Sequence, residues 1–285
     1  MKLLNYIALT FVMLWTCNTA GQEVIQKASG SDERSFGKEI KAVSVFGEKA
    51  SVTVRGADVA EVKVLLRPVS RNSDKGKAVA DLKYINYSVE KEGDRLIIRN
   101  SFRGNPGQIT SNLTMEIEIV MPHSVLADIT NLYGPVKISN IASVNISVSF
   151  GSLRLTGISS ESIIKARYSD MELEAVHGKL EITSEKSDIN ATALDATTDI
   201  NCSYGTADLE TAGAGPLIVR GYRTTVNIRV DEPGKYQYNL RSPQGTIIMP
   251  DGKQYRNQPV EVTPRSPAGL IDVTTSYCDI TIEKK

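Results

Sequence analysis

Two carboxylates stand where spacing could bring them together for chemistry. Asp170 and Asp188 are 18 residues apart, and in a chain that stacks at this interval they would lie about 5 Å apart. Retaining glycosidases use carboxylates at about this separation, and calcium is bound by carboxylate oxygens. The same position in neighbouring segments holds Pro135, Ser152, Thr206 and Thr224. All these types favour turns, so we interpret the aspartates first as turn formers, with a metal site and catalysis as weaker alternatives.

Five aromatic residues recur at almost the same interval, and Lys186 fills the one gap in their series. A line of such rings could bind sugars, because each ring offers an apolar face while a tyrosine hydroxyl stays in water. Strand alternation, however, puts these rings on the same side as buried isoleucines, so we expect them to face inward and to cap the core while stacking on each other. The five residues are Tyr133, Phe150, Tyr168, Tyr204 and Tyr222.

Other reactive residues show no known catalytic or metal-binding spacing. His123 and His177 are far apart, without an H-x-x-x-H or H-E-x-x-H pattern, so no zinc site is expected. Cys202 and Cys278 occupy different phases of the repeat and should lie too far apart for a disulfide. We expect Cys202 to be a buried apolar residue. The sequence thus indicates a protein that is not an enzyme and needs no cofactor.

The elements that must position these residues are short strands in a repeat of roughly 18 residues, a period typical of stacked arrays. An isoleucine stands four residues before each member of the aromatic series: Ile129, Ile146, Ile164, Ile182, Ile200 and Ile218. Further apolar residues follow at plus three and plus five, such as Val136 and Ile138, and at plus eight from Ile141 to Ala212. Glycine or serine, the types that favour tight bends, comes directly after the aromatic position, as at Gly134 and Ser169.

This pattern predicts an all-β protein, specifically a single-stranded β-solenoid or β-helix with coils of about 18 residues and irregular, β-rich ends. No single repeat buries its own apolar face, so neighbouring repeats must stack. We divide the chain into a signal peptide (1–21), a β-rich N-terminal part of the solenoid (22–127), regular coils (128–228) and irregular C-terminal coils with a cap (229–285). Residues 74–82 are expected to form a short helix or a loop.

The first residues have the layout of an export signal, with Lys2 before an apolar stretch that is too short to span a membrane. Cleavage after Ala20 or Gly21 fits the small-residue rule, and lipid modification of Cys17 is the alternative. The chain carries 33 basic and 33 acidic residues, which gives no electrostatic case for nucleic acid or an anionic membrane. After the signal no segment is apolar and long enough to be a transmembrane helix.

Three segments carry a resemblance to a known family. They are FGKEIKAVSVFGEKASVTV at 36–54, TMEIEIVMPHSV at 114–125, and serial units such as Gly134-Pro135-Val136-Lys137-Ile138. With them the chain resembles the bacterial putative-adhesin domains of unknown function, relatives of the auto-transporter adhesin head domains of Bacteroidetes. The resemblance covers most of the chain after the signal and implies an exported β-solenoid with an adhesive or cell-envelope role. The chain departs from the glycine pattern at Ser169, Ser187 and Arg223.

The sequence therefore favours an exported binding or adhesion module of the periplasm, outer membrane or cell surface, with a glycan or a surface protein as its partner. A β-helical polysaccharide lyase or hydrolase that uses Asp170 and Asp188 is one alternative. A periplasmic scaffold or sensor is the other.

Overall fold

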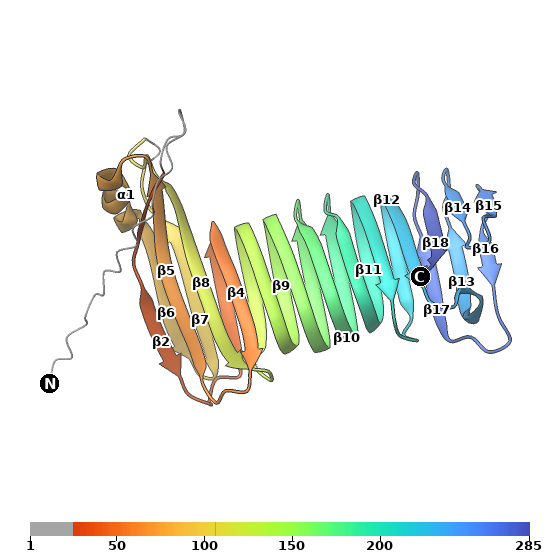
Figure 1. Ribbon diagram of the computed structural model, residues 1–285, viewed down its shortest axis with the longest axis horizontal. Helices are drawn as coiled ribbons and strands as arrows, with labels where there is room; N and C mark the ends of the chain where they lie inside the picture. The colour runs from red at the N-terminus through yellow and green to blue at the C-terminus, as the bar shows by residue number, and fades with distance from the viewer. Residues whose placement is uncertain (1–24, 106) are drawn as a thin grey trace, which may run out of the picture.

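The computed structural model describes residues 25–105 and 107–285 of this chain. The predicted signal peptide, including Cys17, lies outside these residues. Within them the protein is almost entirely β-structure, with one short α-helix, which confirms the all-β class. The strands lie side by side across the length of the molecule (Figure 1).

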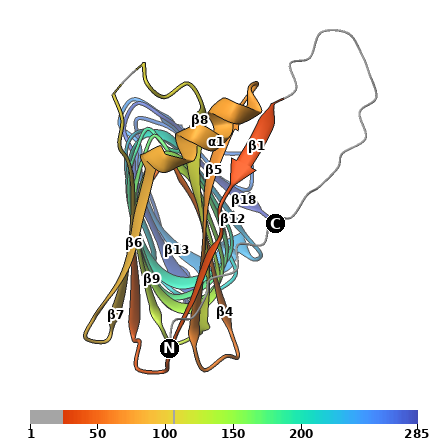
Figure 2. The same cartoon turned by 90° about the vertical axis from the view of Figure 1, so that its left-hand side faces the viewer.

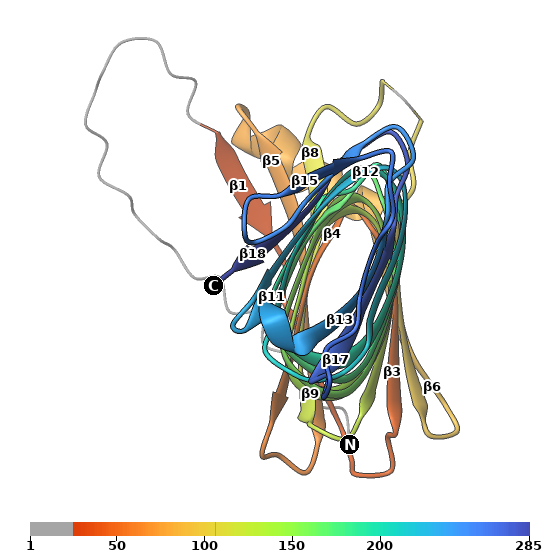
Figure 3. The same cartoon turned by 90° about the vertical axis from the view of Figure 1, so that its right-hand side faces the viewer.

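Four long strand segments form the middle of the molecule: β9 (Leu126–Arg167), β10 (Asp170–Glu185), β11 (Ile189–Thr211) and β12 (Leu217–Val230). Each pairs in parallel with the next. Met171 lies opposite Leu153 on one side and Ile189 on the other, and hydrogen bonds between these turns likewise join residues separated by 18 positions. Viewed along the stack, the ribbons superpose in an elongated ring (Figure 3). The pairing interval therefore equals the spacing of the aromatic series.

The interior of this ring is filled by the apolar residues that the periodicity identified. The isoleucines of the minus-four position are buried from Ile129 to Ile200, as are the residues at plus three and plus five in the first three units. At plus eight, Ile141, Ile158, Val176 and Leu194 are also buried. These positions confirm the predicted core of the regular part of the chain.

The chain turns a corner at residues in the left-handed backbone region. Tyr133, Phe150, Tyr168, Lys186 and Tyr204 all have φ between 50° and 63°. A second corner repeats at Asn140, Gly157, Ala175 and Ala193. Because a left-handed residue interrupts strand alternation, side chains on the two sides of a corner do not follow one parity.

The last regular turn is one residue longer than predicted. Ile200 pairs with Val219 rather than Ile218, and the pairing of Asp208 with Asn227 shows the same separation of 19 positions. Val219 is buried, whereas the predicted core residue Ile218 is partly exposed and Ala212 is exposed. The additional residue lies in the connection 212–216, where Gly213 and Gly215 pass so close to Asp195 and Ala196 that a Cβ atom would clash.

The N-terminal end does not stack in sequence order. β3 (Ala42–Glu48) pairs in parallel with both β7 (Arg95–Phe102) and β9, and β4 (Ala50–Ala57) pairs in parallel with both β8 (Asn112–Pro122) and β9. The layer formed by β3 and β4 is therefore second, and the later segments β7 and β8 form the terminal layer.

Further strands and the α-helix cover this terminal layer. β5 (Val62–Asn72) runs antiparallel to β8, β6 (Ile85–Glu92) runs antiparallel to β7, and β1 (Gln26–Ser29) and β2 (Asp32–Phe36) run antiparallel to β5. The segment 74–82, expected to be a short helix or a loop, contains α1 (Lys75–Asp81), capped by Asp74 and followed by the 3₁₀ helix η1 (Leu82–Tyr84). Figure 2 shows α1 crossing the upper part of this end.

The C-terminal end shows the same change of order. β17 (Gly269–Thr274) and β18 (Ile280–Lys284) pair in parallel with β12, and β13 (Tyr236–Arg241) and β14 (Thr246–Ile248) pair with their other side. The last strands of the chain thus form the second layer, inside β13 and β14 (Figure 1). The short strands β15 (Gln254–Arg256) and β16 (Val260–Val262) close the end, and the 3₁₀ helix η2 (Pro233–Lys235) precedes β13.

Candidate functional site

The aromatic series lies on the outside of the molecule, so the expectation that these rings face inward is wrong. The side chains of Tyr133, Phe150, Tyr168, Tyr204 and Tyr222 are between 39% and 45% exposed. Strand alternation predicted the wrong side because the corner residue itself has a positive φ. Its side chain therefore points away from the core, whereas the residues two and four positions before it point into the core. Of the five rings, Tyr133, Phe150 and Tyr168 stack on one another, as predicted, whereas Tyr204 and Tyr222 meet edge to face.

The first three rings form a continuous stack along one edge. The ring centroids of Tyr133 and Phe150 are 5.2 Å apart with planes inclined by 22°. Phe150 and Tyr168 follow at 5.0 Å and 8°. Both faces of Phe150 are therefore covered by neighbouring rings, whereas Tyr133 has one ring partner and no cation over it among the described residues.

Lys186 continues the line where an aromatic residue is missing. Its Nζ lies 4.8 Å from the centroid of the Tyr168 ring and donates a hydrogen bond of 2.8 Å to the Tyr168 hydroxyl. This hydrogen bond is the main reason that the pKa of the Lys186 ammonium is raised. The stack of three rings is therefore followed by an ammonium that is held at the Tyr168 hydroxyl.

The second part of the line is arranged edge to face. Tyr204 and Tyr222 are 5.5 Å apart at 85°, and Tyr222 and Tyr277 are 6.1 Å apart at 85°. The Arg223 guanidinium lies between 5.4 and 5.9 Å from the centroids of all three rings. We define the aromatic ladder as this whole line: Tyr133, Phe150, Tyr168, Lys186, Tyr204, Tyr222, Arg223 and Tyr277.

Sequence reasoning missed three members of this edge. Tyr277 lies in the segment DVTTSYCDITI, which repeats the apolar spacing and could have supplied it. Arg223, and not Tyr222, is the residue in register with Tyr204, because the preceding turn is one residue longer than the others. Lys49 is in register with Tyr133, since Glu48 pairs with Leu132 and Val52 with Val136.

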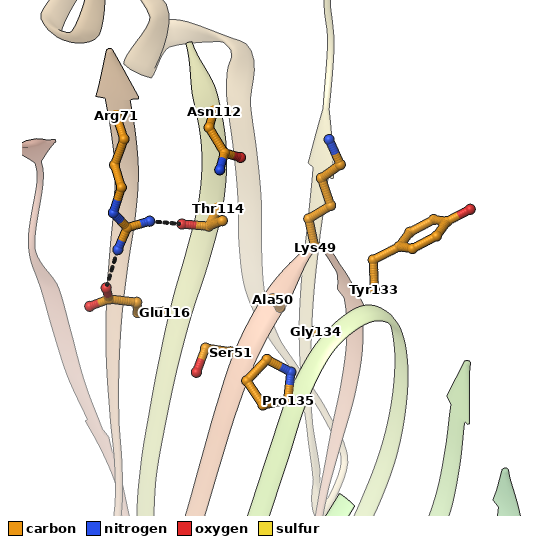
Figure 4. Close-up of a pocket in the computed structure, with 10 residues that line it drawn as sticks. All are labelled: Lys49, Ala50, Ser51, Arg71, Asn112, Thr114, Glu116, Tyr133, Gly134 and Pro135. Atoms are coloured by element: carbon orange, nitrogen blue, oxygen red, sulfur yellow. Dashed lines mark hydrogen bonds and ion pairs between the residues drawn. The ribbon is translucent and has the colours of Figure 1, made fainter. Parts of the chain in front are cut away.

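A pocket of about 430 Å³ opens at the Tyr133 end of the ladder (Figure 4). Its floor is formed by Ala50, Gly134 and Pro135, and its outer wall by residues of β5 and β8. On that wall the Arg71 guanidinium donates to the Thr114 hydroxyl at 3.1 Å and lies 3.7 Å from a Glu116 carboxylate oxygen. The remaining lining residues are Lys49, Ser51, Asn112 and Tyr133.

Asp170 and Asp188 lie on adjacent turns, and each carboxylate accepts a hydrogen bond from a backbone N–H of the next turn. The Asp170 carboxylate accepts a hydrogen bond from the Asp188 N–H at 3.3 Å, and the Asp188 carboxylate accepts one from the Thr206 N–H at 2.7 Å. Asp279 repeats the arrangement with the Thr246 N–H, also at 2.7 Å. These contacts are those of residues that hold a turn together.

The histidines lie apart, and Cys202 and Cys278, the two cysteines among the described residues, are free. His123 is 3.3 Å from Asp58, and His177 is 3.5 Å from Asp195. Cys202 is buried, as predicted, and desolvation by burial raises the pKa of its thiol; Cys278 is half-buried. In residues 25–105 and 107–285 no three or more His, Cys, Asp or Glu side chains are grouped so that they could hold a metal ion.

The helices of this protein are short. Within the part of the chain that the structure describes, no helix has both the length and the apolar character needed to cross a bilayer.

No protein-family model matches the chain, and no curated protein matches its sequence. Among solved structures, it is similar to a putative adhesin from Parabacteroides merdae, at 7% identity over 88% of this chain and 95% of that one, with a TM-score of 0.40. A putative adhesin from Parabacteroides distasonis gives 11% identity, 90% and 97% coverage and a TM-score of 0.37. A putative cell adhesion protein from Clostridium sporogenes is 11% identical over 90% of this chain and 100% of that one, with a TM-score of 0.31.

These descriptions name the same kind of protein as the family that the sequence resembles. At such TM-scores and identities, however, the likeness carries no argument about function.

Proposed function

We propose that this protein is a non-enzymatic binding module of the bacterial cell envelope or cell surface, and that its aromatic ladder is the binding surface for a glycan. The observation that carries the proposal is the exposure of six aromatic side chains in one line, between 39% and 53% of each being accessible. Large apolar side chains gathered at one exposed place are typical of interaction sites, whereas scattered ones are not.

The ladder suits an extended ligand with a repeating structure. A ring or a cation recurs at each turn of the stack, so a linear polymer lying along this edge would meet a side chain of the ladder at regular intervals. Tyrosine adds a hydroxyl that hydrogen-bonds while the ring makes apolar contact, which is the combination a sugar ring needs. The alternative partner is a surface protein that lays an extended segment along the ladder.

We further infer that the parallel stack is a β-solenoid and that residues 1–21 direct the chain out of the cytoplasm. The constant register between successive turns and the ring seen along the stack support the first inference. A solenoid presents its repeated positions as straight columns. The ladder is one such column.

Binding to immobilised polysaccharides tests the role of the ladder. Phe150→Ala and Tyr168→Ala should each reduce retention on the polysaccharides that the wild-type protein binds. Phe46→Ala is the matched control, because Phe46 is 42% exposed and has Arg99 over its ring at 4.9 Å but lies outside the ladder. A wild-type protein that binds no glycan on a broad panel, or a control variant as weak as the ladder variants, would contradict the proposal.

Protease treatment of intact cells tests the location. If the protein is digested while a periplasmic control survives, it faces outward, as an adhesion module should. Digestion only after the outer membrane is opened would favour the periplasmic scaffold or sensor instead.

A further inference from the structure

The pocket at the Tyr133 end of the ladder has a structural cause. At the neighbouring ladder corners the break between strands is short, such as Lys49 between β3 and β4 or residues 168–169 between β9 and β10. In the terminal layer, however, β7 ends at Phe102 and β8 begins at Asn112, so a longer connection stands in place of a corner. Lys49 is in register with the ladder, and the described part of the terminal layer beyond it has no residue at this corner position. The space in front of Lys49 is left open and is bounded by β5 and β8.

Lys49 differs from the other lysine of this column. The Lys186 Nζ lies 4.8 Å from the Tyr168 ring centroid and donates a hydrogen bond to the Tyr168 hydroxyl, whereas Lys49 has no ion pair, ring contact or side-chain hydrogen bond within the described residues. Its neighbour Tyr133 is 45% exposed and has Phe150 as its one ring partner, with no cation over its ring, among the described residues. An exposed cation, Lys49, therefore lies beside the first ring of the ladder.

The rest of the pocket lining favours a polar, negatively charged ligand. The charged side chains are Lys49, Arg71 and Glu116, two cations against one carboxylate. Glu116 is already contacted by Arg71 at 3.7 Å and by Lys27 at 3.4 Å. Ser51 and Asn112 also line the pocket, and neither side chain has a hydrogen-bond partner within the described residues.

We propose that this pocket binds a carboxylated sugar residue of the glycan, with the Tyr133 ring against the sugar ring and the Lys49 ammonium on the sugar carboxylate. Ser51 and Asn112 supply hydrogen bonds to sugar hydroxyls. A volume of about 430 Å³ is within the range of small-molecule sites. The inference rests on the proposed glycan-binding function and adds the class of sugar and the end of the ladder at which it is held.

Two probes that differ only in the carboxylate test this assignment. Methyl β-D-glucuronide and methyl β-D-glucoside are titrated into the purified protein and followed by nuclear magnetic resonance. A charge-assisted contact predicts that the glucuronide binds about tenfold more tightly than the glucoside. This preference should decrease as salt is raised, because the pocket is open to solvent.

Variants assign the effect to residues. Lys49→Gln should abolish the preference for glucuronide, while Tyr133→Leu should weaken both probes. Lys179→Gln is the matched control and should leave both affinities unchanged, because that lysine lies outside the ladder and the pocket and is paired with Glu161 and Glu181. Unaltered melting temperatures establish that each variant is folded.

Equal affinity for the two probes, no binding of either, or a preference that survives Lys49→Gln overturns the assignment of the pocket. If polysaccharide retention still depends on Phe150 in that case, the proposed function stands and only the acidic-sugar site fails. If the protein binds no glycan at all, both fail.

Discussion

One residue per turn of the stack carries both the bend of the backbone and the ladder side chain. From Lys49 to Tyr277, the residues at this corner have φ values between 46° and 64°, and none of them is glycine. Each side chain with a Cβ costs roughly 1–2 kcal/mol in this backbone region. The second corner bears the same cost at Ala175 and Ala193, but at the ladder corner it falls on Tyr, Phe, Lys and Arg, whose large side chains can serve the fold or a ligand.

Phe150→Gly separates these two uses. Glycine relieves the left-handed backbone while the stacking energy is lost, and because the two terms are of similar size we expect the free energy of unfolding to stay within about 1 kcal/mol of wild type. Glycan retention should nevertheless fall. Urea unfolding and the polysaccharide assay measure the two quantities. A loss of stability of about 3 kcal/mol or more with binding retained would mean that the rings serve the fold.

Asp188 offers a second prediction, on the turn-forming role of the aspartates. Asp188→Asn keeps an oxygen that accepts from the Thr206 N–H, so its stability should match wild type, whereas Asp188→Ala should lose about 1 kcal/mol. Thermal and urea unfolding distinguish the variants. The double variant Asp170→Asn with Asp188→Asn also tests the enzymatic alternative: if the wild-type protein cleaves a polysaccharide and this variant does not, the turn-forming interpretation is incomplete.

The elements of the regular part were predictable because their apolar positions recur with a fixed period. Ile146 and Leu153, for example, were expected in the core and are each 1% exposed. The direction of Phe150 was not predictable from alternation, because its own left-handed backbone interrupts the strand. The register of β12 was misjudged because a glycine-containing connection hides one extra residue, and a period assumed constant cannot detect it.

The short helix α1 gives a prediction at the scale of elements. Its last residue, Asp81, is buried and accepts hydrogen bonds from the backbone N–H groups of Thr110 and Ser111 at 3.2 and 3.0 Å. Hydrogen bonding from the Ser111 side chain, with these backbone groups, holds the pKa of Asp81 below its ordinary value. The contact therefore joins α1 to the residues that lead into β8.

Because the pKa is lower in the folded state, Asp81 stabilises the fold at pH values above its unfolded pKa. This stabilisation is lost as the pH falls below about 4 and the carboxylate becomes protonated. Asp81→Asn should reduce stability at neutral pH and make the acid side of the stability profile less steep. Urea unfolding from about pH 2 to about pH 7, which spans the ordinary carboxyl titration, is the measurement; an unchanged acid slope would show that Asp81 does not contribute.

At the scale of the whole molecule, the order of the layers departs from the order of the sequence at both ends. β3 and β4 lie inside β7 and β8, and β17 and β18 lie inside β13 and β14. The repeat could not predict this, because periodicity tells which side chains face the core and not which layer is next to which. At the C-terminal end the short antiparallel strands β15 and β16 lie outermost, which limits pairing with other molecules.

This order predicts that residues close to the chain end are important for the whole stack. Ile282 is 1% exposed and pairs with Ile228 of β12. Ile282→Ala should reduce the free energy of unfolding by about 2–5 kcal/mol. Glu283→Ala, next to it and exposed, is the control and should change little. Equal and small effects of both variants in urea unfolding would contradict the position of β18 inside the stack.

The position of β18 also has a mechanical consequence. The strand is hydrogen-bonded along one side to β12 and, at Ile280 and Thr281, along the other side to β14. A tensile force on the C-terminus would pull β18 along its own length, so that the bonds to β12 and β14 are loaded together in shear. A strand at the outer edge would instead peel away one bond at a time. β18 should therefore resist a force along its own length better than a strand at the outer edge would.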